Sequence, residues 1–394
     1  MTTLNKTDVF VKAAELREFG VYNQPLMDMW VKVAEERELQ DTPICAVAAL
    51  NNADTDHALL ALLREYPREI LEGLCHVAVA VDAEEKILVL PEGQEALGEE
   101  LAALCEEHKV WIEYGIVNVR QYRGSAIHHF ETLLALTQTI NGTYEPGTYV
   151  AVKKDGKVGE LKKVAYGTTV ADVIGETDIH SFALGRKLYK PESLNMTIEA
   201  DTNLGSGVIT VYPTSCCIVS ETEKVLMSSR QQSCGKCTFC REGLIQLHTM
   251  VKEITEGKGK KEYMDMMSEI GEAMVFSTPC SMGQTGSQFT LSSMELFLDE
   301  YEDHTKRKKC KNNVCSAFMS IYIDPSACTG CEDCVDVCPV DCIEGKSGFI
   351  HMIDSFECTK CGKCIAACEE EAIIQTSGRV PKLPSRLIKC GKFR

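Results

Sequence analysis

The sequence predicts a chain of the α/β plus α class: an α/β domain, a small β-grasp module, a helical bundle and a cysteine-rich domain, in that order. Three observations support this prediction. Apolar runs alternate with helical patterns over the first third of the chain, whereas apolar residues recur with a period of about 3.6 beyond Cys234. The spacing C-x2-C-x2-C occurs three times from Cys234 onward. We expect five parts, at residues 1–140, 141–215, 216–305, 306–324 and 325–394.

Composition excludes several functions before any motif is considered. With 394 residues and 44% hydrophobic content, the chain can bury more than one core. A net charge of −17 argues against nucleic acid or an anionic membrane as the main partner, because both attract clustered Lys and Arg. No apolar run approaches about 18 residues and the N-terminus lacks a leader pattern, so we expect a cytoplasmic chain without a membrane span.

The α/β domain is predicted from alternating patterns between residues 40 and 135. The runs PICAVAALN, CHVAVAVDAEEKILVL and KVWIEYGIV suggest strands, and DHALLALLREYPREILEGL and GEELAALCEEH suggest crossover helices. The following module reads as a strand, a turn at Asp155-Gly156, a second strand and a short helix capped by Thr168 or Thr169. That order is typical of a β-grasp module.

Three amphipathic helices are expected after Cys234. Apolar residues recur at helical spacing over residues 244–254, 263–274 and 291–301. Each apolar stripe needs a partner to cover it, so we expect a small bundle. The methionines on these stripes are interpreted as core residues, and the basic run TKRKKCKNN as a solvated linker.

The strongest chemical signal is a repeated cysteine motif near the C-terminus. The pattern C-x2-C-x2-C-x3-C begins at Cys328 and again, thirty positions later, at Cys358. Three closely spaced thiolates hold three irons of a [4Fe-4S] cube, and the fourth cysteine of each run ligates the other cluster. We therefore expect a ferredoxin-like domain with two clusters, one held by Cys328, Cys331, Cys334 and Cys368 and the other by Cys358, Cys361, Cys364 and Cys338. Zinc would require neither the repeat nor the crossed partners.

A third group of cysteines opens the helical bundle. The segment SCGKCTFCREG supplies Cys234, Cys237 and Cys240 but no fourth cysteine nearby. Cys280, in STPCSMGQTG between the second and third predicted helices, would return to the same end of an antiparallel bundle. We expect these four residues to hold a third [4Fe-4S] cluster, with a zinc knuckle as the alternative.

A weaker metal pattern lies at the predicted linker. His304, Cys310 and Cys315 are ligand types that suit zinc, with Cys390 or Cys342 as the candidate fourth ligand. Cys342 is otherwise interpreted as a packed thiol near the first cysteine run. Spacing alone does not distinguish this site from surface thiols on a linker, so both interpretations stay open.

The remaining cysteines are interpreted as buried small apolar residues. Three of them lie in apolar runs of the α/β domain, and two adjacent ones lie in VYPTSCCIV. For that adjacent pair, packing is favoured over a position facing the bundle cluster. The five residues are Cys45, Cys75, Cys105, Cys216 and Cys217. Because the cysteines of the metal motifs are grouped, we expect them to be reduced thiolates in a reducing compartment and not disulfides.

The segments SCGKCTFCREG, ITEGKG, STPCSMGQT and FLDEYEDH together resemble the flavin- and NADH-binding subunit of respiratory complex I and its relatives in bifurcating hydrogenases and formate dehydrogenases. The resemblance continues upstream through LGSGVITV, YGTTVADVI and HHFETLLAL, and covers most of residues 10–305. It implies a nucleotide-binding-like α/β domain and an SLBB-like β-grasp module. Hydrogenase-type relatives also carry a two-cluster ferredoxin domain after a cysteine-containing bridge.

In that family the α/β domain binds FMN and NADH through a loop of the form R-G-x-G-G-A-G-F-P-x-G-x-K-W. The stretch LREFGVYNQPLMDMW keeps only part of it, at Arg17, Gly20, Pro25 and Trp30. Side chains replace four glycines and a methionine replaces the lysine near the flavin phosphate, at Glu18, Val21, Asn23, Met27 and Met29. A backbone that must approach a phosphate or a flavin closely does not tolerate side chains there. We therefore expect a degenerate loop that binds neither FMN nor NADH.

One other motif of the family is partly present, and another is absent. Asn52-Ala53-Asp54 matches the start of an N-A-D-E stretch, but Thr55 replaces its acidic residue. The family's later G-E-E-T has no counterpart here.

We expect an iron–sulfur electron-transfer subunit of a cytoplasmic multi-subunit oxidoreductase complex, relaying electrons through three [4Fe-4S] clusters without catalytic residues of its own. The alternative is an FMN-containing NADH:acceptor dehydrogenase subunit, which the loss of glycines disfavours. The expected partners are a flavoprotein or a catalytic subunit of the hydrogenase or formate dehydrogenase type, a thioredoxin-like [2Fe-2S] subunit, and ferredoxin.

Overall fold

The computed structural model describes residues 4–20, 22–37, 43–185 and 187–393. The chain divides into two compact units, which are described separately. The first consists of Met1–Cys216, Thr222–Thr249 and Met264–Leu296, and the second of Cys217–Glu221, Met250–Tyr263 and Phe297–Arg394. Among the described residues, no helix is long and apolar enough to cross a membrane. The expected mixed architecture, with a parallel sheet and separate helical regions, is observed.

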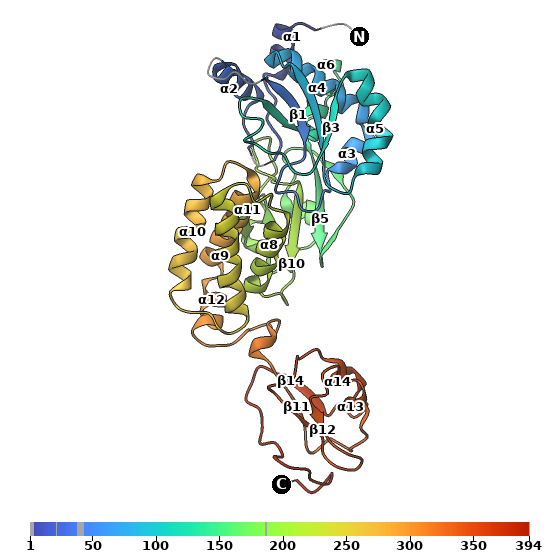
Figure 1. Ribbon diagram of the computed structural model, residues 1–394, viewed down its shortest axis with the longest axis vertical. Helices are drawn as coiled ribbons and strands as arrows, with labels where there is room; N and C mark the ends of the chain where they lie inside the picture. Colours follow the sequence, from blue (N-terminus) through green and yellow to red (C-terminus); the bar gives the residue numbers. More distant parts are fainter. Residues whose placement is uncertain (1–3, 21, 38–42, 186, 394) are drawn as a thin grey trace. The chain divides into compact units, whose positions relative to one another are not determined.

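The first unit begins with a four-stranded parallel sheet in the order β3-β2-β1-β4 (Figure 1). Its strands are β1 (Cys45–Ala49), β2 (Glu85–Leu90), β3 (Trp111–Tyr114) and β4 (Ala126–His129). The helices of this region are α1 (Lys6–Ala13), α2 (Leu26–Arg37), α3 (Leu60–Glu65), α4 (Pro67–Val81), α5 (Glu95–His108) and α6 (Phe130–Asn141). All of β1 is buried, as expected for a central parallel strand with both faces covered. The strand order reverses between β1 and β4, so their carboxyl ends form the switch point at which such sheets bind ligands.

Helix α4 corrects one expectation. The segment CHVAVAV, interpreted as part of a strand because of its valines, continues this helix as far as Val81. Pro67 occupies the first turn, and Asp82 ends the helix in the left-handed conformation. Gly73 packs so closely on α6 that an added Cβ would lie 2.3 Å from the carbonyl oxygen of Leu133. This helix–helix contact outweighs the β preference of the valines.

A second sheet of six strands follows, in the order β6-β5-β10-β8-β9 with β7 beside β5. Its strands are β5 (Thr148–Lys154), β6 (Lys157–Val158), β7 (Lys162–Val164), β8 (Ser181–Leu184), β9 (Lys187–Tyr189) and β10 (Val208–Tyr212). Asp155 and Gly156 form the predicted turn, with φ angles of 48° and 75°. Thr169, and not Thr168, caps α7 (Val170–Ile174), because its hydroxyl accepts the backbone N–H of Asp172. A 3-10 turn, Pro191–Ser193, precedes β10.

Five helices follow the second sheet: α8 (Ile218–Gln232), α9 (Thr238–Thr255), α10 (Tyr263–Ser277), α11 (Ser281–Leu296) and α12 (Leu298–Thr305). Glycines allow close packing between those parts of the helices that lie in the first unit. An added Cβ on Gly243 of α9 would lie 2.3 Å from the sulfur of Met274 in α10, and one on Gly271 of α10 would lie 2.9 Å from Leu291 in α11. Met274 and Leu291, which belong to the predicted apolar stripes, thus lie at helix–helix contacts within this unit.

The second unit contains two small antiparallel sheets. β11 (Ser320–Ile323) pairs with β14 (Ile373–Thr376), and β12 (Ile343–Glu344) pairs with β13 (Met352–Ile353). The short helices α13 (Asp333–Asp336) and α14 (Lys363–Ala367) lie within the two cysteine runs and contain the third cysteine of each, and a 3-10 turn, Ser316–Phe318, precedes β11. Matching hydrogen bonds relate the two halves. The N–H of Asp354 donates to the carbonyl of Cys342, and that of Asp324 donates to the carbonyl of Ala372, both at 2.8 Å.

Candidate functional site

The cysteines of the C-terminal repeat line two separate cavities within the second unit. One cavity joins the first three cysteines of the first run to the last cysteine of the second run: Cys328, Cys331, Cys334 and Cys368. The other joins the complementary set: Cys358, Cys361, Cys364 and Cys338. The side chains thus lie in the crossed arrangement that the spacing predicts. That each set holds an iron–sulfur cluster stays a prediction.

Local backbone geometry turns these thiols toward the cavities. Glu332 and Gly362 precede the two short helices with φ angles of 77° and 76°, so the chain bends sharply after the second cysteine of each run. Burial raises the pKa of Cys334 to about 12, and the neighbouring thiols of Cys328 and Cys331 add to this effect. A cationic centre among the thiols favours their thiolate forms, and an iron–sulfur cluster provides one.

The bundle cysteines converge within the first unit. Cys234 and Cys237 precede α9, Cys240 lies in its first turn, and Cys280 directly precedes α11. Burial raises the pKa of the Cys240 thiol, and electrostatic interactions with Cys280, Cys237 and Cys234 raise it further. Cys237, Cys240 and Cys280 are buried, whereas Cys234 is exposed. Cys280 is thus near enough to Cys240 to influence its thiol, and that the four hold one cluster stays a prediction.

The surroundings of Cys280 link this set to the α/β domain. Burial raises the pKa of the Cys280 thiol, whereas two backbone N–H groups at the start of α11 and the side chain of Asn52 lower it. The backbone N–H of Ala53 donates to the hydroxyl of Ser281 at 3.1 Å. Donors of this kind tune a metal-bound thiolate. Asn52-Ala53, retained from the family's flavin motif, thus supports a candidate cluster ligand.

A third kind of site lies within the second unit. Cys217, His304, Cys310 and Cys315 are buried, and their ligand atoms all lie within 4.8 Å of one another. The Sγ atoms of Cys217 and Cys315 are 3.8 Å apart, and His304 Nε2 lies 3.4 Å and 3.3 Å from these two sulfurs. A tetrahedral zinc ion with Zn–S of about 2.3 Å and Zn–N of about 2.0 Å would place two sulfurs about 3.8 Å apart, and sulfur and nitrogen about 3.5 Å apart. The set therefore fits a single tetrahedral ion.

His304 is oriented for ligation. Its Nδ1–H donates to the backbone carbonyl of Glu300 at 2.7 Å, which leaves Nε2 facing the thiols. Phe318 packs against the ring edge-on, with centroids 5.0 Å apart. A hydrogen bond to the second ring nitrogen is the usual support of a metal-bound histidine.

The predicted fourth member of this set was wrong. Cys342 lines the second ferredoxin cavity, and Cys390 is hydrogen-bonded to Cys328, so neither belongs to it. Cys217, interpreted as a packed thiol, takes that place at the start of α8. It lies 87 positions from His304 in the chain, so no local spacing could indicate the pair.

The degenerate loop occupies the switch point of the parallel sheet. Glu18 is 3% exposed, and its carboxylate accepts the backbone N–H of His129 at 2.7 Å and Nδ1–H of His128 at 2.5 Å. Phe19 stacks on His129 with ring centroids 4.5 Å apart. The indole N–H of Trp30 donates to Nε2 of His128 at 2.9 Å. Both nitrogens of His128 thus have partners, and the carboxylate that replaces a family glycine is bonded inside the crevice.

The other loop positions also contact protein atoms. Arg17 donates to the side chain and the carbonyl of Asn23 at 3.1 Å and 2.7 Å, and Met29 packs against the apolar core. Gly20 has a φ angle of 84° and lies so close to Gly205 that an added Cβ would be 2.4 Å from its carbonyl oxygen. The replacement at Val21 lies outside the described residues.

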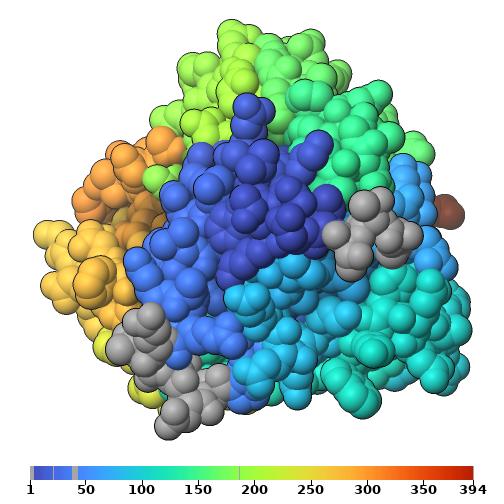
Figure 2. All heavy atoms as spheres, turned by 90° about the horizontal axis from the view of Figure 1, so that it is seen from above, coloured from blue at the N-terminus to red at the C-terminus, as the bar shows by residue number. Residues whose placement is uncertain are grey.

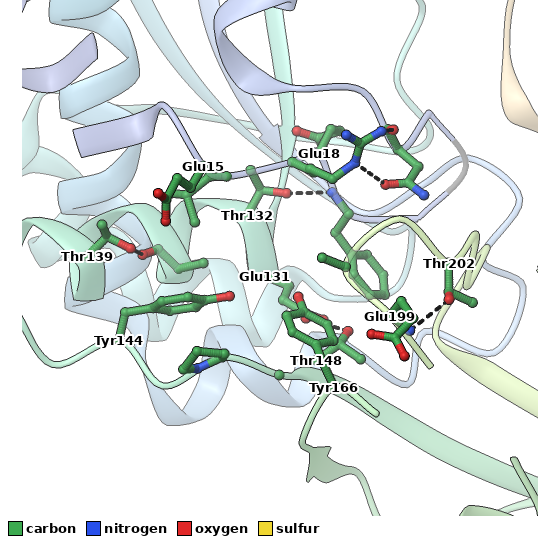
Figure 3. Close-up of a pocket in the computed structure, with 18 of the residues that line it drawn as sticks. Glu15, Glu18, Glu131, Thr132, Thr139, Tyr144, Thr148, Tyr166, Glu199 and Thr202 are labelled. Carbon is green, nitrogen blue, oxygen red and sulfur yellow. Dashed lines mark hydrogen bonds between the residues drawn. The ribbon is translucent and has the colours of Figure 1, made fainter. Parts of the chain in front are cut away.

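A cavity of about 440 Å³ lies on the outer side of this loop. It is bordered by the N-terminal residues and by the segments around residues 131–148 and 199–204, which lie side by side in Figure 2. Figure 3 shows four carboxylates around it, from Glu15, Glu18, Glu131 and Glu199. Burial raises the pKa of Glu131 to about 8. Two cationic side chains, Lys12 and Arg17, also line this cavity.

At the carboxyl ends of β1, β2 and β3 the remaining space is small. The cavity there measures about 20 Å³, whereas pockets that bury a drug-sized ligand measure roughly 300–1,000 Å³. Asn52 closes it with two hydrogen bonds to the backbone of Val117, at 2.8 Å and 2.9 Å.

Comparison with known proteins agrees with the cysteine sets. Residues 221–304 match the family described as the NADH-ubiquinone oxidoreductase-F iron-sulfur binding region, and residues 320–369 match the 4Fe-4S dicluster domain. The chain is 40% identical over 142 residues to the HndC component of the NADP-reducing hydrogenase of Solidesulfovibrio fructosivorans, a match covering 36% of this chain and 29% of that protein. It is 29% identical over 111 residues to the F component of the NADH-quinone oxidoreductase of Streptomyces coelicolor, covering 28% and 25%. The matches span less than a third of these relatives. The family resemblance found in the sequence is confirmed.

The fold is similar to a crystal structure of an NAD+-reducing [NiFe]-hydrogenase in the H2-reduced state. The TM-score is 0.63, and the match covers 76% of this chain and 62% of that chain. The sequence identity is 18%, so this likeness concerns the fold alone.

Proposed function

From the premise that this chain carries the iron–sulfur binding region of the NADH-ubiquinone oxidoreductase-F family followed by a 4Fe-4S dicluster domain, we propose that it is an electron-transfer subunit of a multi-subunit oxidoreductase complex. The observation that carries the proposal is the convergence of three separate sets of four cysteines. Three bound [4Fe-4S] clusters would supply one-electron transfer. The chain's own contribution is to hold them with thiolates and to tune them with backbone N–H groups.

The loss of the flavin site is part of this proposal. It is supported by the Glu18 carboxylate, which accepts the backbone N–H of His129 at the switch point, and by Phe19, which lies against the His129 ring. The lysine that would offset a phosphate charge is replaced by Met29, which is partly buried against the apolar core. The α/β domain and the SLBB-like β-grasp module would then serve as a scaffold for a partner subunit.

We further propose a structural zinc ion at Cys217, His304, Cys310 and Cys315. The donor set and its distances fit one tetrahedral ion, and all four ligand positions are protein atoms, as in structural zinc sites.

The proposed partners follow the relatives' names. HndC belongs to a hydrogenase and the Streptomyces coelicolor relative to an NADH-quinone oxidoreductase, so a catalytic hydrogenase- or formate dehydrogenase-type subunit or a flavoprotein is the expected electron donor. A thioredoxin-like [2Fe-2S] subunit and ferredoxin are the further partners we propose. The thiolate sets require a reducing compartment, for which we propose the cytoplasm.

Cofactor analysis of the full chain, purified without oxygen, tests this proposal against an FMN-dependent NADH dehydrogenase. We expect about twelve irons per chain, no flavin in an acid extract, and no bleaching of the iron–sulfur absorbance by NADH. Dithionite should bleach that absorbance, which shows that the clusters are redox-active. Stoichiometric FMN together with bleaching by NADH would establish the dehydrogenase function instead.

A further inference from the structure

The second ferredoxin cavity contains a fifth cysteine. Cys342 is 6% exposed and lines this cavity together with the four cysteines of the predicted set. Its Sγ lies 3.6 Å from Sγ of Cys338, and its side chain is also hydrogen-bonded to that of Cys358. A [4Fe-4S] cube takes one cysteine for each of its four irons. One thiol in this cavity therefore exceeds the number required.

The other half of the domain provides an internal comparison. Cys342 follows Cys338 by four positions, and Ala372 follows Cys368 by four positions. Their carbonyls accept equivalent hydrogen bonds of 2.8 Å, from Asp354 and Asp324. The two positions are thus equivalent in sequence spacing and in this backbone hydrogen bond, and one carries a thiol where the other carries a methyl group.

Packing alone does not require this sulfur. Ala372 is 2% exposed, so a methyl group fills the equivalent space beside the first cavity. The Cys342 thiol instead lies between two of the second cavity's thiols, Cys338 and Cys358. Because the two sulfurs are 3.6 Å apart, rotation about the Cα–Cβ bonds of Cys338 and Cys342 would allow either sulfur to take the ligand position in this cavity.

We propose that Cys342 is an alternative ligand of the second ferredoxin cluster, which replaces Cys338 at one iron when Cys338 is removed. If Cys338 is present, the two residues would exchange as ligands. The iron–sulfur bond of Cys338 would break, that of Cys342 would form, and the thiol proton of Cys342 would pass to the Cys338 sulfur. No electron is transferred. This inference rests on the proposed pair of clusters in the C-terminal repeat.

The test compares iron content among variants of the full chain prepared without oxygen. Cys338→Ala should keep the wild-type content of about twelve irons, and Cys338→Ala combined with Cys342→Ala should fall to about eight. Cys368→Ala, in the half that has Ala372, should also fall to about eight. Adding Ala372→Cys to Cys368→Ala should restore the iron. Low-temperature EPR of the reduced proteins should show a shifted signal for one cluster in Cys338→Ala, because one of its ligands has changed position.

The outcomes separate this inference from the proposed function. Equal iron loss in Cys338→Ala and Cys368→Ala would overturn the inference while leaving both clusters in the wild-type chain. Retention of iron in the Cys338→Ala/Cys342→Ala double variant would overturn it as well, because three thiolates would then suffice. Iron loss in Cys342→Ala alone would show that Cys342 is the resident ligand. A low iron content in the wild-type chain would count against the proposed number of clusters. The iron contents of the variants would still be compared with that of the wild-type chain.

Discussion

The crevice of the parallel sheet and the ferredoxin cavities both follow a family's binding pattern, but their polar atoms have different partners. In the crevice, the Glu18 carboxylate is bonded to His128 and His129, and Phe19 covers the His129 ring. In each ferredoxin cavity, four or five thiols converge on one another, and burial raises the pKa of thiols such as Cys334.

Under the proposed function, this difference separates a site that has lost its cofactor from sites that still bind one. Where a cofactor is no longer bound, neighbouring side chains can satisfy one another, and their contacts contribute to stability. Where a charged group must still bind, its ligands stay close together in an arrangement that is unfavourable without it. Removing a residue should therefore cost stability in the crevice and a bound metal in the cysteine sets.

The largest expected effect is the loss of a whole cluster from the bundle set. Cys280→Ser should remove about four of about twelve irons and leave the two ferredoxin clusters in place. Iron determination and EPR after anaerobic purification measure this loss. Cys75→Ser, a half-buried cysteine outside every set, is the matched control and should keep all the iron. Unchanged iron in Cys280→Ser would mean that another residue is the fourth ligand.

The next effect is the loss of a single ion from the four-residue set. Cys217→Ser should lower bound zinc from about one per chain to a small fraction, because three ligands remain of four. Elemental analysis of protein expressed with zinc measures this change. The adjacent Cys216 is also buried but does not belong to the set, so Cys216→Ser should retain the zinc. Equal zinc in both variants would refute the site.

In the crevice, the expected effect is on stability alone. Glu18→Gln keeps the shape of the side chain but turns one acceptor into a donor, which leaves His128 or His129 without an acceptor. The cost should be about 1.5–3 kcal/mol. Both tryptophans, Trp30 and Trp111, lie in this domain, so their fluorescence during denaturant unfolding reports it. Glu15→Gln, exposed on the same cavity, should change stability by less than about 0.5 kcal/mol. Comparable losses in the two variants would contradict the filled crevice.

A further expected effect is a pH dependence of stability caused by Glu131. Burial raises the pKa of its carboxyl from 4.5 to about 8, so between these values the folded chain binds a proton that the unfolded chain has lost. Stability due to this group therefore falls as the pH rises through that range, by up to about 1.4 kcal/mol per pH unit. The buried His129, whose pKa burial lowers to about 3, contributes a slope only below its ordinary pKa of 6.5.

Glu131→Gln should reduce the fall in stability between pH 6.5 and 8. The same tryptophan fluorescence measures it at several pH values, with the Glu15→Gln variant as the control. A slope that is unchanged in Glu131→Gln would mean that this carboxyl is already ionised in the folded chain.

The parts of the site that could be predicted from sequence are those set by short-range spacing. The crossed sets follow from the repeat, because the first three cysteines of each run are close in sequence. The fourth cysteine, Cys338 or Cys368, then joins the set of the other run. Cys280 could be predicted as the fourth cysteine of the bundle set, because helical periodicity indicates where the chain turns back. Cys217 was missed because it meets its partners only through the tertiary fold, and the apolar run around it is equally typical of packing.

The same limit applies to the fold and the crevice. The valines of CHVAVAV suggested a strand, whereas the contact between Gly73 and Leu133 makes this segment part of α4. Comparison with the family's loop indicated that side chains fill the flavin site. It did not show that Glu18 would be bonded to two histidines from β4, because that contact spans 110 positions of the chain.

The four-residue metal set has a consequence for the order of assembly. Cys217 and Cys315 are separated by 98 positions, and the loop between them contains all four bundle cysteines. A metal ion that joins the two ends removes loop-closure entropy from the unfolded chain, worth about 4–5 kcal/mol for a cross-link of this length. Zinc bound early would therefore restrict the chain before iron arrives, and would bias the segment from Cys234 to Cys280 toward the compact form that binds a cluster.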